Sequence, residues 1–242
     1  MSSPKHLARI AGVFYLLVGI FGGFAEGFAD PKLYVAGNAA ATAGNVIANP
    51  GLVRMSVVAH LLDATFFVLT AMALYYLFRH VQKSVARALL VFAALAVGIL
   101  TLNAVFQFES LQVATDSTYS AAFGAAGSNA LVLLMLDIQH YGTLAAQVFF
   151  GLWLAPMGYL AYKSGMFPRA LGVVLVGAAG SYLVDLLAAF LAPDLAKQVH
   201  PILAIAPTIG EVWMVLYLLV IGVRSSSAVD RAHTTELAPM PA

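Results

Sequence analysis

The sequence predicts an all-α, polytopic membrane protein whose six transmembrane helices form one bundle. Hydrophobic residues make up 62% of the 242 residues and charged residues only 10%, so the chain is far more apolar than a soluble domain. Six apolar runs are each long enough to cross a hydrocarbon layer about 30 Å thick. Lysine and arginine gather on every second connection between these runs, as alternating spanning helices require.

The six predicted helices cover residues 10–25, 52–78, 88–113, 129–162, 169–191 and 201–223. Lys5 and Arg9 precede the first run, as in a signal peptide, but the run is long and no small-residue cleavage site follows it. We therefore interpret it as an uncleaved spanning helix. Residues 30–51, with a proline near each end, are expected to form a loop with a short surface helix from Thr42 onward.

Charged, polar and proline-containing segments also mark the connections after the second, third and fifth predicted helices. A basic group from Arg79 to Arg87 closes the second helix, and a polar segment without lysine or arginine, residues 115–128, follows the third. Pro193 and Pro201 are expected to bracket a loop before the sixth helix. Residues 1–223 thus form one transmembrane domain, and residues 224–242 form a polar cytoplasmic tail that is expected to be disordered.

The basic residues also predict the orientation of the chain. Of the 12 lysines and arginines, only Lys32, Arg54 and Lys197 fall on the side opposite the termini. Both termini are therefore expected in the cytoplasm. Similar starts around Arg9 and its counterparts in the third and fifth helices suggest a repeat of three helical hairpins, although orientation alone also favours an arginine at each of these positions.

Ionisable residues interrupt the helices at a common depth. Asp137 and His140 are spaced i, i+3 and share one face of the fourth helix. At 1.5 Å per residue, six side chains fall about 10–17 Å from the outer ends of their helices. These six are His60, Asp63, Asp137, His140, Asp185 and Glu211. Because such groups are costly against lipid, the sequence predicts one polar pocket in the outer half of the membrane.

Four further residues are assigned to this pocket, namely Glu26, Asn103, Gln107 and Gln147. His200, beside a proline at the mouth of the sixth helix, is expected to be a loop residue outside it.

One hypothesis for the pocket is a metal site. His60, Asp63 and His140 would bind a divalent metal such as zinc, and the metal would acidify a bound water to serve as a nucleophile. Carboxylates at Asp137, Asp185 and Glu211 would be catalytic in the hydrolysis of a lipid or lipid-linked substrate.

Three alternatives stay open. A proton-coupled small-molecule transporter would use the buried carboxylates to exchange protons. A haem could lie between His60 and His140. In a structural or interaction protein, the same groups would only hold helices together through hydrogen bonds.

Composition excludes other classes. The chain has no cysteine, which excludes disulfides, thiolate catalysis and thiolate metal sites. Its net charge is +1, and no basic cluster interleaved with aromatic residues occurs, so nucleic acid is not an expected partner. Membrane lipid and a small-molecule or lipid ligand are the expected partners.

Seven short motifs in a fixed order connect the chain to known proteins. They are Ala8-Arg9-Ile10-Ala11-Gly12 with Glu26, Gly37-Asn38-Ala39-Ala40-Ala41-Thr42, His140-Tyr141-Gly142, Phe149-Phe150-Gly151-Leu152, Tyr162-Lys163-Ser164-Gly165-Met166-Phe167-Pro168-Arg169, Tyr182-Leu183-Val184-Asp185 and Ile209-Gly210-Glu211. Over nearly the whole chain they resemble a bacterial family of multi-spanning membrane proteins, domain of unknown function 4386. The resemblance implies a shared architecture in the bacterial plasma membrane and supplies no reaction.

The resemblance also bears on individual residues. It implies that Glu26, His140, Asp185 and Glu211 occupy positions of the family's pattern. His60 departs from that pattern, since relatives often carry aspartate there, and this weakens any mechanism that needs two histidines.

Overall fold

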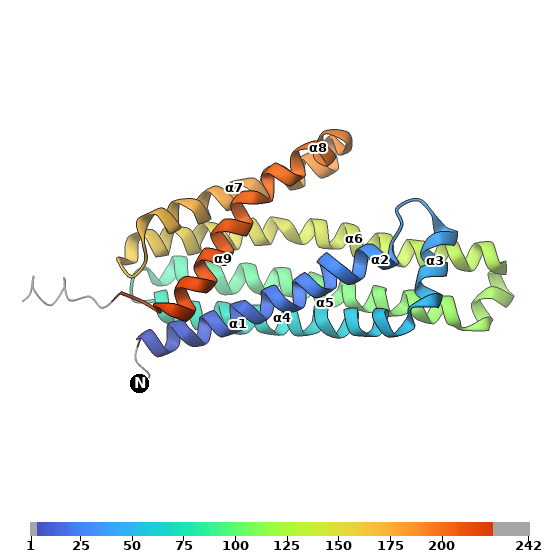
Figure 1. The fold of residues 1–242 in the computed structure, drawn as a ribbon, viewed down its shortest axis with the longest axis horizontal. Coiled ribbons are helices and arrows are strands. Elements are labelled where there is room, and N and C mark those ends of the chain that lie inside the picture. The colour runs from blue at the N-terminus through green and yellow to red at the C-terminus, as the bar shows by residue number, and fades with distance from the viewer. Residues whose placement is uncertain (1–3, 225–242) are drawn as a thin grey trace, which may run out of the picture.

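The computed structural model describes residues 4–224, and between these limits the regular elements are helices, with no β-strand (Figure 1). Six segments are long and apolar enough to cross a membrane: Pro4–Leu33, Pro50–Phe78, Lys83–Thr115, Ser117–Ser164, Arg169–Leu191 and Pro193–Val220. The prediction of six apolar helices is confirmed, and such a set is what a multi-pass membrane protein contains. The predicted tail, residues 225–242, lies outside the described residues.

The first helical segment is longer than predicted. α1 (Pro4–Phe24) continues through the π-helical turn η1 (Ala25–Ala29) into α2 (Asp30–Leu33). The expected loop from residue 30 is therefore wrong at its start, because Pro31 stands in the first turn of α2, where proline is tolerated. The π turn joins the two helices, and the N–H of Asp30 donates to the carbonyl of Ala25 across it.

A short helix, α3 (Ala39–Ala48), lies across the end of the bundle that is distant from the termini (Figure 1). It begins three residues before the predicted Thr42, because the side chain of Asn38 caps it by accepting a hydrogen bond from the N–H of Ala41 at 3.0 Å. α3 packs against α4 (Pro50–Phe78), α5 (Lys83–Thr115) and α6 (Ser117–Ser164). It thereby covers a second, smaller hydrophobic core that includes Leu33 and Val46.

The polar segment predicted at residues 115–128 is helical from Ser117 onward and there belongs to α6. Asp116 caps its start, accepting hydrogen bonds from the Thr118 hydroxyl at 2.6 Å and the Thr118 N–H at 2.9 Å. These bonds favour the carboxylate and lower the pKa of Asp116. Gly124, with φ of 71°, breaks the helix in a backbone conformation that side chains disfavour.

The last third of the chain contains α7 (Arg169–Leu191), α8 (Pro193–Leu203) and α9 (Ile205–Val220). α7 has the predicted bounds. The predicted loop between Pro193 and Pro201 is wrong: Pro193 starts α8 at a position where its missing N–H costs nothing, and Pro201 lies in the last turn of the same helix.

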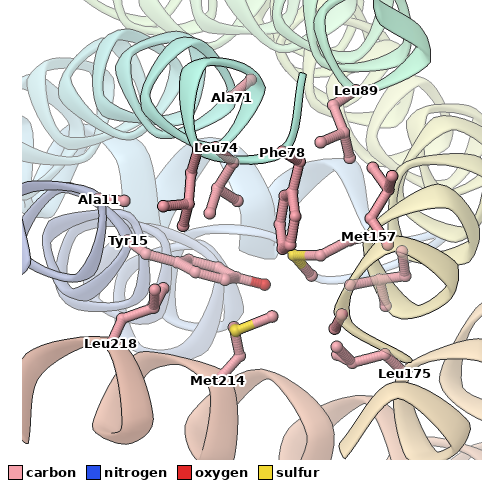
Figure 2. Close-up of a cluster of buried hydrophobic side chains, with 14 of the residues drawn as sticks. Ala11, Tyr15, Ala71, Leu74, Phe78, Leu89, Met157, Leu175, Met214 and Leu218 are labelled. Carbon is pink, nitrogen blue, oxygen red and sulfur yellow. The ribbon is translucent and has the colours of Figure 1, made fainter. Parts of the chain in front are cut away.

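The main hydrophobic core lies at the end of the bundle where the described chain begins and finishes. Tyr15, Phe78, Met157, Leu175 and Met214 extend into it from five different helices (Figure 2). The backbone of Gly222 lies against that of Lys5, so the first and last described residues share this end. The side of the membrane that this end faces stays a prediction.

The helices of each proposed hairpin are in contact, since α1 packs against α4, α5 against α6 and α7 against α9. This arrangement agrees with three hairpins. The internal repeat itself stays a prediction.

α6 and α7 approach most closely at Gly158 and Gly172. A Cβ atom on Gly172 would lie 2.7 Å from the carbonyl oxygen of Gly158 and 2.8 Å from the backbone nitrogen of Tyr162. Only glycine allows the two backbones to meet at this distance.

We therefore expect Gly172→Ala to lower the free energy of unfolding by about 1–3 kcal/mol, because the added methyl group forces the two helices apart. Gly177→Ala on the same helix is the matched control, since nothing lies within 4 Å of its Cβ position. The control should leave stability unchanged or raise it by up to about 1 kcal/mol. Unfolding of both variants in detergent micelles measures the difference, and equal behaviour would contradict the close approach.

Candidate functional site

Three adjoining cavities lie among the helices and share the side chain of Glu26. The aromatic cavity, of about 220 Å³, is bounded by α1, η1, α4, α6, α7 and α9. The α8 cavity, of about 190 Å³, includes Asp185 and His200. The histidine cavity, of about 430 Å³, includes His140 and also His200. Because neighbouring cavities share lining residues, they form one polar region.

Three carboxylates from three elements line the aromatic cavity: Glu26 on η1, Asp63 on α4 and Glu211 on α9. Glu211 accepts hydrogen bonds from the hydroxyl of Tyr15 at 2.7 Å and from the hydroxyl of Tyr182 at 3.0 Å. Asp63 is only 6% exposed, yet it has no hydrogen-bond partner between residues 4 and 224.

Five aromatic side chains form a belt around the same cavity. Consecutive ring centroids are 5.3 Å apart for Tyr15 and Trp153, 4.9 Å for Trp153 and Phe67, 5.9 Å for Phe67 and Phe150, and 6.0 Å for Phe150 and Tyr182. Both tyrosines at the ends of this series donate to Glu211. The belt is therefore closed by a carboxylate.

A second polar centre surrounds Asp30, whose carboxylate is bound by side chains from three helices. One oxygen accepts from Ser56 at 2.9 Å and from Gln107 at 2.7 Å. The other accepts from Gln139 at 2.6 Å and lies 3.1 Å from Nε2 of His60. This node joins α2 to α4, α5 and α6, and its charge is fully compensated by hydrogen bonds.

Two further pairs line or flank the histidine cavity. Nδ1 of His200 lies 2.8 Å from Asp185, which brings α8 onto α7. The hydroxyl of Tyr34 donates to Asp137 at 2.6 Å, and its ring stacks on His140 with centroids 5.1 Å apart. Burial and this hydrogen bond raise the pKa of Tyr34, so the phenol stays a donor.

The structure brings most of the predicted residues to this region in three groups. Six of them line the cavities: Glu26, Asp63, His140, Gln147, Asp185 and Glu211. His60 and Gln107 belong to the Asp30 node. Asn103 donates to Thr143, a lining residue, and Asp137 pairs with Tyr34.

The predicted metal ligands do not form one cluster. His60 contacts Asp30, Asp63 faces the aromatic cavity, and His140 stacks on Tyr34. Within the described part of the chain, no group of three or more histidines and carboxylates is arranged to hold a metal. The roles assigned to these residues stay predictions.

Several residues of the site were not found from the sequence. The proline after Asp30 predicts a loop there, although the spacing of four between Glu26 and Asp30 is a helical signal. His200 was placed outside the pocket, but α8 folds back and directs it to the cavities. Tyr15 carries no signal in the sequence, since tyrosine is common in apolar helices, and Tyr182 is marked only by its place in the motif Tyr182-Leu183-Val184-Asp185.

Two buried polar atoms beside the cavities have no hydrogen-bond partner within residues 4–224. They are Nε1 of Trp153, in the aromatic cavity, and Oε1 of Gln147, in the other two. Buried polar atoms are rarely left in this way. Both atoms are enclosed by protein and leave hydrogen-bonding capacity unused.

The fold and the cavities define a multi-pass helical membrane protein with an acidic, aromatic interior. The chain belongs to the family described as Domain of unknown function (DUF4386), whose profile matches residues 10–222. An uncharacterized protein of the archaeon Archaeoglobus fulgidus is 29% identical over 123 residues, which is 51% of this chain. The match spans 60% of that relative's length. No solved structure matches the chain.

The Asp30 node yields a test of stability. Asp30→Ala leaves Gln107, Gln139 and His60 without their shared acceptor, so we expect a loss of about 3 kcal/mol in the free energy of unfolding. Asp194→Ala is the control, because Asp194 is exposed and its ion pair is with the exposed Lys197, and a change within about 0.5 kcal/mol is expected. Chemical unfolding in mixed micelles measures both, and equal losses would contradict the role of the node.

Proposed function

We propose that the protein is a proton-coupled carrier of small molecules, with the aromatic cavity as its binding site. The observation that supports this function is the convergence of Glu26, Asp63 and Glu211 on one cavity whose lining contains neither lysine nor arginine. Three carboxylates without a basic partner cannot all be ionised cheaply inside a membrane protein. Their charge must be neutralised either by bound protons or by a bound ligand. If ligand binding displaces protons from the carboxylates, transport of the ligand is coupled to transport of protons.

The distribution of packing suits a carrier that is closed at one end. Beyond the aromatic cavity, toward the termini, the bundle is filled by the main core around Met157 and Met214 (Figure 2). In the other direction the α8 cavity and the histidine cavity continue from Glu26. Pro156 in α6 interrupts helical hydrogen bonding and supplies a point at which this helix can bend.

The carrier is tested by recording currents from proteoliposomes on a solid-supported membrane while amines, sugars, amino acids and organic acids are added in turn. We expect at least one class to give a protein-dependent current that changes with an imposed pH gradient. Glu211→Gln should abolish this current, because it removes a titrating group. Glu109→Gln should keep it, since Glu109 lines none of the three cavities. Absence of current for every class, or indifference to pH, would contradict the proposal.

A second candidate, hydrolysis, is favoured by the pair of His200 and Asp185. A carboxylate that orients a histidine is the arrangement of a general base, and Ser181 and Thr208 line the same cavity. Hydrolysis predicts turnover of fluorogenic acyl or phosphate esters in micelles, with or without added zinc. His200→Gln should then reduce turnover at least tenfold while Glu109→Gln does not, and no turnover of any ester would reject this candidate.

A further inference from the structure

We infer that the aromatic cavity binds a small organic ammonium ion, a protonated or quaternary amine with an apolar body. This inference names the ligand class of the proposed carrier and rests on that function for the site, although ammonium binding itself requires no transport.

The charges around the cavity favour a cation. Glu211 has two tyrosine hydroxyls as donors, but Asp63 has no hydrogen-bond partner among the described residues although it is 6% exposed. A nearby basic side chain, His60, is already paired with Asp30 and does not line the cavity. Among residues 4–224, Asp63 therefore has no basic group in hydrogen-bond or ion-pair contact, and a carboxylate in this setting requires a cation or must take up a proton.

The walls favour an organic cation over a metal ion. Hard divalent cations take six or more oxygen ligands at short distances, and the carboxylates here form no such group within residues 4–224. The lining instead includes five aromatic rings, Tyr15, Phe67, Phe150, Trp153 and Tyr182. A cation within about 6 Å of a ring centroid is attracted by the face of the ring, and cages of several rings recognise ammonium groups.

The arrangement of the rings strengthens this assignment. Trp153 is in edge contact with both Tyr15 and Phe67, so the rings stand at steep angles to one another and surround the space between them. Glu211 accepts hydrogen bonds from Tyr15 and Tyr182, the two rings at the ends of the belt. Asp63 lies on α4, the helix that also carries Phe67, the middle ring of the belt. A bound ammonium group would meet aromatic faces and carboxylates together.

The size of the cavity limits the ligand. Drug-sized ligands occupy pockets of roughly 300–1,000 Å³, whereas the aromatic cavity has about 220 Å³. A single substituted ring or a short alkyl chain beside the ammonium group fits this space.

The chain supplies its own reporter for a binding test. It contains two tryptophans, and only Trp153 lines the cavity. In a Trp213→Phe background, the fluorescence of Trp153 in detergent is followed during titration with phenethylammonium. Its neutral isostere, 2-phenylethanol, serves as the ligand control.

We expect saturable quenching by phenethylammonium and an affinity for 2-phenylethanol at least tenfold weaker. Asp63→Asn, which keeps the size of the side chain, should weaken ammonium binding at least tenfold, while Glu109→Gln leaves it unchanged. Equal binding of the two ligands, or unchanged binding in Asp63→Asn, would overturn the inference. If Asp63→Asn does not run as a folded protein in size-exclusion chromatography, Phe67→Leu is tested instead. It should also weaken ammonium binding at least tenfold, and unchanged binding in this variant would overturn the inference.

The same ligand separates this inference from the proposed function. Binding in detergent without any protein-dependent current in proteoliposomes would keep the ammonium site and reject the carrier. A pH-dependent current with another class of compound, together with no ammonium binding, would keep the carrier and reject the ammonium site.

Discussion

The carboxylate of Asp30 is the polar centre on which the arrangement of the helices depends. Inside an apolar bundle a charged group must find partners in protein, and Asp30 finds them on α4, α5 and α6 at once. To reach them, the first helical segment extends past Phe24 through a π turn and carries Asp30 inward. Glu26, four residues before Asp30 on the same continuous segment, lies beside the cavities.

The two kinds of acid in the bundle differ in how well they are satisfied. The Asp30 carboxylate has four hydrogen-bond contacts and contributes to stability, whereas Asp63 has none with any residue between 4 and 224 and faces a cavity. Structural acids are paired because unpaired ones are costly, so an acid left unpaired is maintained for another reason. This contrast separates the groups that hold helices together from the groups that are available to a ligand.

The length of the apolar runs predicted the helices, and the distance of each polar residue from its helix end predicted six of the lining residues. Both quantities depend only on position along the sequence. They failed at Pro31 and Pro193, which were interpreted as loop residues although each occupies the first turn of a helix. They also could not show which side chains meet. Contacts such as Tyr15 with Glu211 depend on the rotation of each helix about its axis and on the return of α8, which apolar periodicity does not determine.

The π turn at Ala25–Ala29 sets the angular offset between Glu26, which faces the cavities, and Asp30, which faces the hydrogen-bonding node. Each residue of an α-helix rotates the side-chain direction by about 100° about the helix axis. A single-residue insertion or deletion between these two acids would turn one of them toward lipid, even if every residue type were kept. Spacing here is thus as constrained as residue identity, and natural length variation should be confined to the turns that connect the helices.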